Sequence, residues 1–344
     1  MSVDEAKKNI QSIFRDGLAV IVGSGLSTAE GLPSMTGLAN HLISALDGKL
    51  AEPHRSNWEQ ISAALSTGVG LEQALTDIEP DEEVLSLIKE ETATLFRTNE
   101  RAIITEVVKE AKFLRFTHLI RAFPPSSAVI PIITTNYDRL LEYACEVRGY
   151  CVDSMFVGNY LGKLDRKEST LSFCRGYKTR QNKVVLEYAQ RFKVLKPHGS
   201  LDWYYLGGRP IRCSADLNMT PLIIPPGASK YRAGYDQPFD VHREQANYEI
   251  DRASRYLIIG YGFNDDHLQT HLDKNLRDGK PCLVVTKELS PSGSSLFKSC
   301  TNVTALTEKK GHPKCTEYRH FDGSVRDLDG GLWDIENLVK GVLL

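Results

Sequence analysis

The stretch LAVIVGSGLSTAEGLP, residues 18–33, decides the fold of this chain. Five consecutive apolar residues, 18–22, run directly into a turn that contains Gly23 and Gly25. An unbroken apolar run is typical of a strand buried on both faces of a parallel sheet. The turn has two interpretations: the glycines permit a tight connection to the next helix, or they let a ligand lie close to the backbone. The motif alone does not choose, since Thr28 stands where the dinucleotide-binding fingerprint has its third glycine.

Several further apolar runs predict strands that alternate with helical patterns. They are found at residues 130–134, 193–195, 255–260, 282–285 and 301–306, with a shorter one in PLIIPPG at 221–227. Helical periods cover about 138–147 and 239–254. Strands alternating with helices predict an α/β fold, in which a parallel sheet carries helices on both faces.

The organisation of the chain follows from where this alternation is interrupted. Residues 36–122 repeat apolar positions every three or four residues and predict an inserted helical module. Residues 153–192 are polar and predict a second, small insertion. We therefore expect a sheet domain built from 1–35 and 123–310, followed by a C-terminal tail and helix at 311–344.

The composition of the chain argues against several classes of function. The chain has 344 residues, a net charge of -2 and 41% hydrophobic residues, so no overall charge favours a nucleic acid or a membrane surface. No apolar run approaches the length of a membrane span, and the N-terminus has no signal-peptide pattern. The seven cysteines include no C-x-x-C pair, which predicts free thiols, no zinc site and a cytoplasmic protein.

Polar residues gather where the predicted strands end, which is where parallel sheets bind ligands. The run TTNYD ends at Asp138, and a helix cap would need only one residue such as Asn136 or Asp138. Two threonines, an asparagine and an aspartate at one strand end therefore favour a polar site over capping alone. His198 is either structural or a group for proton transfer. Asn264 and Asp265 follow a glycine-rich turn and would cap the next helix or hold ribose hydroxyls.

Taken in order, GSGLSTAEGLP (23–33), TTNYD (134–138), KPHGS (196–200), PLIIPPGASK (221–230) and LIIGYGFNDDHL (257–268) resemble the sirtuin family. Within it they are most similar to the bacterial sirtuin-like branch that acts in antiphage defence. The resemblance implies a Rossmann-like sheet that binds NAD, with the first glycine loop along the pyrophosphate. It assigns Asn136 and His198 to catalysis. It assigns NAD binding to Gly23, Ser24, Gly25, Ser27, Thr135, Asp138, Gly199, Ser200, Gly260, Tyr261, Gly262, Asn264 and Asp265.

Departures from the family pattern change the expected reaction. The four-cysteine zinc module of deacylase sirtuins is missing, Ser34–Met35–Thr36 replaces their aspartate-phenylalanine-arginine run, and Thr135 replaces a glutamine. We therefore expect an NAD+ glycohydrolase that transfers ADP-ribose to water and acts in defence. In this hypothesis Asn136 orients the water or the ribose, His198 is a general base or binds ribose hydroxyls, and Asp138 supports the loop.

Partners and alternatives remain open at this stage. The resemblance implies a homo-oligomer and a HerA-type ATPase partner. The alternatives are a non-catalytic NAD or ADP-ribose sensor, a nuclease that would place magnesium near Asp265 and Asp266, and a residual deacylase.

Overall fold

The computed structural model describes residues 2–181, 183–227 and 236–344. Its centre is a nine-stranded sheet formed by these residues. From one edge to the other, the strands are β15 (Val325–Asp329), β14 (His312–Arg319), β13 (Val303–Lys309), β12 (Cys282–Val285), β11 (Arg255–Ile259), β1 (Leu18–Val22), β2 (Val129–Thr134), β8 (Arg191–Leu195) and β3 (Cys151–Asp153). All neighbouring pairs from β13 to β3 are parallel, whereas the pairs β13–β14 and β14–β15 are antiparallel. The predicted α/β class with a parallel sheet is therefore confirmed.

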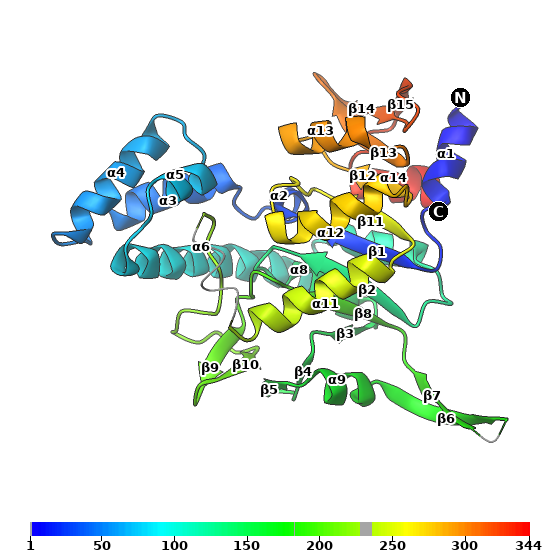
Figure 1. Cartoon of the computed structure of the whole chain (residues 1–344), viewed down its shortest axis with the longest axis horizontal. Coiled ribbons are helices and arrows are strands. Elements are labelled where there is room, and N and C mark those ends of the chain that lie inside the picture. Colours follow the sequence, from blue (N-terminus) through cyan, green and yellow to red (C-terminus); the bar gives the residue numbers. More distant parts are fainter. Residues whose placement is uncertain (1, 182, 228–235) are drawn as a thin grey trace.

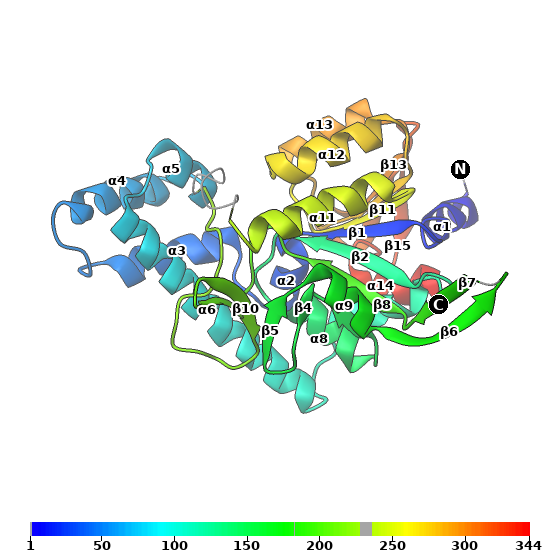
Figure 2. The same ribbon diagram turned by 60° about the horizontal axis from the view of Figure 1, so that its bottom comes forward.

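Helices cover both faces of this sheet, as Figure 2 shows. All five residues of β1 are buried, and they alternate between two apolar cores: Val20 and Val22 pack on one side, Ala19 and Ile21 on the other. The second side is covered by α11 (Phe239–Arg252), α12 (Asp266–Arg277) and α13 (Pro291–Ser299). The first side is covered by α1 (Val3–Gln11), α8 (Leu140–Val147), α14 (Ile335–Leu338) and the helical segment between β1 and β2.

That segment is helical, as predicted for residues 36–122. After the short α2 (Ser24–Glu30) it contains α3 (Met35–Leu46), α4 (His54–Ser66), α5 (Leu71–Asp77), α6 (Glu82–Val108), α7 (Arg115–Leu119) and the 3-10 turn η1 (Ile120–Ala122). Figure 1 shows α3, α4 and α5 extending to one side of the sheet, with α6 running beneath them back toward it. No helix in the described ranges is both long and apolar enough to cross a bilayer.

Residues 153–192 contain more regular structure than their polar sequence suggested. They form β4 (Phe156–Val157), β5 (Leu161–Leu164), α9 (Arg166–Ser172), β6 (Cys174–Arg180) and β7 (Lys183–Tyr188). Strands β4 and β5 join β10 (Arg209–Cys213) and β9 (Trp203–Leu206) in a small antiparallel sheet. Strands β6 and β7 form a hairpin that projects from the body (Figure 1).

Two expectations about secondary structure were wrong. Residues 221–227 form no strand, only an isolated bridge from Ile223 to Gly199, because Pro221, Pro225 and Pro226 have no N–H to donate. Residues 228–230 of the same quoted motif lie outside the described residues. After residue 310 the chain adds β14 and β15 to the sheet before α14 and the π-helical turn η2 (Val339–Leu343), rather than only a tail and helix. The proposed domain boundaries themselves stay a prediction.

The topology places a crevice beside β1. From β1 the chain moves through β2 to β8 on one side, and it later returns to β11 on the other side. The connections therefore diverge at the carboxyl ends of β1 and β11, which is the position where open α/β sheets bind ligands.

The loops that leave β1 and β11 cross in direct backbone contact. The N–H of Gly23 donates to the carbonyl of Ile259, and the N–H of Gly25 donates to the carbonyl of Gly260, each at 2.9 Å. A Cβ atom on Gly23 would lie 2.5 Å from the Gly260 oxygen, and one on Gly25 would lie 2.7 Å from the Gly260 Cα. Both glycines are therefore required by loop packing, whatever else the turn binds.

We predict that Gly25→Ala destabilises the protein by about 1–3 kcal/mol, because the new methyl group overlaps backbone atoms that have no room to move. Gly176→Ala is the control, since nothing lies within 4 Å of the Cβ it would add; its effect should stay within about 0.5 kcal/mol. Urea unfolding measures both. Equal stability of the two variants would contradict the crossing-loop explanation.

Candidate functional site

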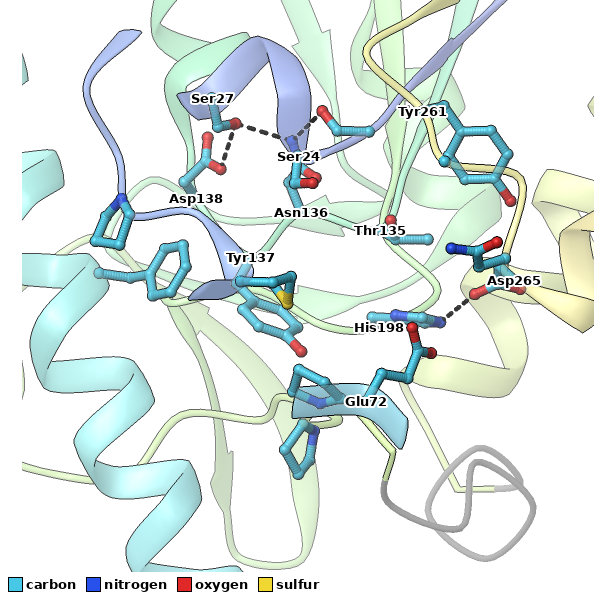
Figure 3. Close-up of a pocket in the computed structure, with 18 residues that line it drawn as sticks. Ser24, Ser27, Glu72, Thr135, Asn136, Tyr137, Asp138, His198, Tyr261 and Asp265 are labelled. Carbon is cyan, nitrogen blue, oxygen red and sulfur yellow. Dashed lines mark hydrogen bonds and ion pairs between the residues drawn. The ribbon is translucent and has the colours of Figure 1, made fainter. Parts of the chain in front are cut away.

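A pocket opens at the crevice between the carboxyl ends of β1, β2, β8 and β11 (Figure 3). Predicted site residues that line it are Gly23, Ser24, Ser27, Thr135, Asn136, Asp138, His198, Tyr261, Gly262, Asn264 and Asp265. Sequence reasoning missed the other lining residues, which are Pro33, Met35, Glu72, Phe96, Tyr137, Pro225 and Pro226. The loops expected to meet thus do converge on one cavity.

Asn136 is fixed by hydrogen bonds on its amide nitrogen. Its Nδ2 donates to the carbonyl of Gly23 at 3.0 Å and to Ser27 Oγ at 2.8 Å. Both amide hydrogens are therefore used, and Oδ1 makes no hydrogen bond to any described residue. The side chain can offer an arriving ligand an acceptor but not a donor.

Asp138 belongs to the same network and holds the loop together. Its Oδ2 accepts from Ser27 Oγ at 2.7 Å, and its Oδ1 accepts from the backbone of Leu140 at 3.2 Å, next to the start of α8. Burial raises the pKa of Asp138, and the nearby Lys196 ammonium opposes that rise. These contacts agree with a supporting role for Asp138.

His198 pairs with Asp265 across the pocket. The His198 Nε2 lies 2.6 Å from Asp265 Oδ2, while Asp265 Oδ1 accepts from the N–H groups of His267 and Leu268 at 3.1 and 3.0 Å. Asp265 is thus the N-cap of α12, as one alternative predicted. A carboxylate at this position favours a proton on Nε2, which leaves Nδ1 as the basic nitrogen of the ring.

Lys196 connects the loop of Asn136 to the loop of His198. It is 1% exposed, and its Nζ lies 2.8 Å from Glu142 Oε1. The same ammonium donates to the carbonyl of Asp138, and at 3.4 Å to Ser200 Oγ. One side chain therefore ties the loop of Asn136 to the loop of His198. A lysine directly before the Pro197–His198 pair at a strand end was the available signal, and sequence reasoning did not use it.

His242 on α11 supports the same region. Its Nδ1 accepts the backbone N–H of Lys196 at 3.2 Å, and its ring centre lies 4.4 Å from that of Trp203. Burial lowers the pKa of His242 to about 3, with further lowering from the Lys196 and Lys193 ammonium groups. The ring is therefore neutral at physiological pH.

An apolar wall closes the pocket opposite this polar network. It consists of Pro33, Met35, Phe96, Tyr137, Pro225 and Pro226. Met35, Phe96 and the acidic Glu72 come from helices α3, α6 and α5, so the helical module contributes directly to the site. Gly227 continues the proline loop against α5, since a Cβ there would lie 2.6 Å from the carbonyl oxygen of Glu72.

Four predicted ligand contacts do not line the pocket: Gly25, Gly199, Ser200 and Gly260. Gly25 and Gly260 pack the crossing loops. Gly199 has φ 91°, and a Cβ on it would lie 2.0 Å from the carbonyl oxygen of Leu222. The N–H of Ser200 donates to that same oxygen at 3.2 Å. For these four residues the structure gives a packing role, and contact with a ligand stays a prediction.

The acidic residues that line the described pocket are Glu72, Asp138 and Asp265, with no lysine or arginine among the lining residues. Such a lining suits a ligand that carries or develops positive charge. Within the described residues, no three His, Cys, Asp or Glu side chains are grouped as a metal site would require.

Comparisons with known proteins agree with the family resemblance for part of the chain. Residues 131–289 match the family model of the SIR2-like domain. The match includes the loops of Asn136, His198 and Asp265 and leaves out the glycine loop after β1. No curated protein matches the chain.

Similar solved structures include a Sir2 complex with a p53 peptide and NAD+, at 14% identity and a TM-score of 0.41, covering 99% of this chain and 96% of that one. A structure on sirtuin substrate affinity shares 13% identity at a TM-score of 0.40, with 99% and 96% covered. The structure of Sir2Tm bound to a propionylated peptide shares 16% sequence identity at a TM-score of 0.37, and the match covers 83% of this chain and 87% of that one.

We predict that Lys196→Met destabilises the protein by about 3 kcal/mol, because it leaves the buried Glu142 carboxylate without its partner. The double variant Lys196→Met/Glu142→Gln should recover most of this loss. Lys49→Met, which breaks a half-exposed pair with Glu91, is the control and should cost about 1 kcal/mol or less. Urea unfolding of all three variants is the measurement, and a double variant no more stable than the single one would contradict this account.

The lowered pKa of His242 predicts acid sensitivity. In the unfolded state His242 becomes protonated below about pH 6.5, whereas in the folded state it stays neutral down to about pH 3. The free energy of unfolding therefore falls as the pH falls through this window. The slope should be on the order of 1 kcal/mol per pH unit. His242→Gln should flatten the dependence between pH 6 and 4, whereas His312→Gln, an exposed control on β14, should not. If the stability of the wild type and of His242→Gln changed equally with pH, His242 would not be the cause of the acid sensitivity.

Proposed function

We propose that this protein is an NAD+ glycohydrolase that releases nicotinamide and ADP-ribose. The observation that carries the proposal is the meeting of Asn136 and His198 in one pocket at the crevice beside β1, together with Gly23, Ser24 and Asp265. The SIR2-like match of residues 131–289 supports the choice of NAD as substrate.

The reaction breaks the bond between the nicotinamide nitrogen and C1′ of the ribose, and it forms a bond from C1′ to a water oxygen. Nicotinamide leaves with the bonding electron pair and becomes neutral, and the water loses one proton. Because the ribose passes through an oxocarbenium-like state, the site must tolerate positive charge at C1′. The carboxylates of Glu72 and Asp265 provide a suitable electrostatic environment.

His198 would take the proton from water or bind the ribose hydroxyls through Nδ1. Its pairing with Asp265 supports this role, since a carboxylate on Nε2 orients the ring and stabilises the imidazolium that forms. Asn136 would act through Oδ1, as the acceptor for the attacking water or for a ribose hydroxyl, because its amide hydrogens are already bound to Gly23 and Ser27.

The rest of the pocket would bind the remainder of the dinucleotide. The apolar wall of Met35, Phe96 and Pro225 fits the nicotinamide ring and excludes bulk water. The backbone at Gly23 and Ser24 would face the pyrophosphate at the N-terminus of α2. Tyr261, Gly262 and Asn264 would hold the adenosine end.

We further infer, from the resemblance alone, that the enzyme is an antiphage effector in the cytoplasm that depletes NAD. Its control would come from a homo-oligomer and a HerA-type ATPase partner. A sensor that binds NAD without turnover is the alternative that the activity assay distinguishes.

Purified protein incubated with NAD, alone and with its neighbouring gene product, should release nicotinamide and ADP-ribose in equal amounts. Asn136→Ala and His198→Ala should each lower kcat/KM by about 10²-fold or more. The matched controls Asn159→Ala and His312→Ala change exposed residues and should keep the wild-type rate. Chromatographic quantification of nicotinamide measures turnover. Binding of NAD without any product would favour the sensor, and wild-type rates in both site variants would end the assignment.

A further inference from the structure

A second pocket lies at the opposite, amino-terminal edge of the same strands. It is bordered by Asp16 and Gly17 before β1, by Ser126 and Ser127 before β2, and by Arg191 at the start of β8. Its volume is about 600 Å³. Since β1, β2 and β8 each send their other ends to the candidate NAD pocket, the two cavities are separated by the sheet's own strands.

Arg191 is a buried cation with unused hydrogen-bond donors. It is 4% exposed, and among the described residues its only ion pair is Nε to Asp153 Oδ2 at 3.4 Å. Neither Nη1 nor Nη2 makes a hydrogen bond to a described residue, and Nη1 is fully buried. Buried donors are nearly always paired, so a guanidinium in this state is an anomaly that a bound acceptor would resolve.

The guanidinium of Arg191 is also held in a fixed orientation. Its central carbon lies 5.0 Å from the ring centre of Phe173 and 5.4 Å from that of Tyr188. Contacts with aromatic rings restrict the guanidinium without using its N–H groups. The donor fork is therefore positioned in advance, as recognition of a planar or tetrahedral oxyanion requires.

Lys193 adds a second loosely paired cation on the same face of β8, two residues further along. It is 9% exposed, and its Nζ lies 3.5 Å from Glu249 Oε1, which already accepts from Gln245 at 2.9 Å. A separation of 3.5 Å is at the outer limit of a hydrogen bond. Like Arg191, Lys193 lines the cavity with capacity for a closer acceptor.

The mouth of the pocket carries further positive charge. Arg166 of α9 lies 3.8 Å from Glu244, and Arg252 of α11 stacks over Tyr248 at 5.3 Å. Asp16 adds negative charge here: the hydroxyls of Ser127 and Ser126 donate to its carboxylate at 2.6 and 2.8 Å, and these hydrogen bonds lower its pKa. Four cations and two carboxylates line the cavity, and two further carboxylates, Asp153 and Glu244, lie against Arg191 and Arg166.

We propose that this pocket is a binding site for an oxyanion, namely the phosphate group of a small phosphate ester. The fork of Arg191 and the ammonium of Lys193 bind the phosphate oxygens. Arg166 and Arg252 complete the charge balance at the mouth, and the exposed ring of Tyr248 contacts the organic part of the ester. This site is independent of the proposed NAD chemistry, which involves the other edge of the sheet.

Isothermal titration with inorganic phosphate and with glycerol 3-phosphate, at constant ionic strength set with potassium chloride, tests the proposal. The wild type should bind both, and it should bind the ester more tightly because Tyr248 contacts the organic part; equal affinity for the two would contradict that contact. Arg191→Lys keeps the charge but removes the fork, and it should weaken phosphate binding at least tenfold. Arg252→Met, at the exposed mouth, should weaken it less and serves as the second variant if Arg191→Lys does not fold.

Two control variants test whether phosphate binds in this pocket and not elsewhere on the protein. Arg175→Met removes an exposed arginine outside the pocket and should bind phosphate like the wild type. Asn136→Ala should also bind it normally, whatever happens to NAD turnover, so failure here is separable from failure of the proposed function. No phosphate binding by the wild type, equal binding by Arg191→Lys and Arg175→Met, or a loss confined to Asn136→Ala would each overturn the proposal.

Discussion

The structure depends on the backbone contact between the loops that leave β1 and β11. Gly23 and Gly25 meet Gly260 at distances that exclude any Cβ atom, and two hydrogen bonds join the loops. This contact sets the start of α2, and with it the position of Ser27. Because Ser27 bonds to both Asn136 and Asp138, the placement of the next loop follows from the first. The close contact between the two glycine loops therefore influences the geometry of the whole pocket.

Hydrogen bonds and one ion pair then link the loops. Asn136 donates to Gly23, Lys196 donates to Asp138 and Ser200, and His198 pairs with the carboxylate of Asp265. Each link joins segments that are distant in the chain. The polar side of the site is consequently a closed network, while its apolar side is supplied by the helical module and the proline loop. The polar side fixes the orientation of the site side chains, and the apolar side limits the access of water to the pocket.

The sequence was sufficient for the parts of the fold that depend on local pattern. Strands β1, β2, β11 and β12 are mostly apolar, and β8 (RFKVL) was expected only at 193–195 because Arg191 and Lys193 interrupt its pattern. The polar ends of these strands marked the loops that converge. Strand β14, which lies between β13 and the edge strand β15, escaped notice because HPKCTEYR has no apolar run and only Thr316 and Tyr318 are buried. The pocket wall from Glu72 and Phe96, and the bridging role of Lys196, depend on packing between distant helices and loops, which no local pattern records. Ligand contacts of the predicted site residues remain proposals.

The pocket draws its lining from residue 23 to residue 265, and this spread has a consequence for synthesis. A nascent chain on the ribosome can complete β1 and the helical module early, but Asp265 and the loop of Gly260 emerge only after three quarters of the protein has been made. Until then Gly25 has no partner loop and His198 has no carboxylate. The cavity can therefore be completed only after Asp265 has left the ribosome, and no shorter fragment of the growing polypeptide contains its whole lining.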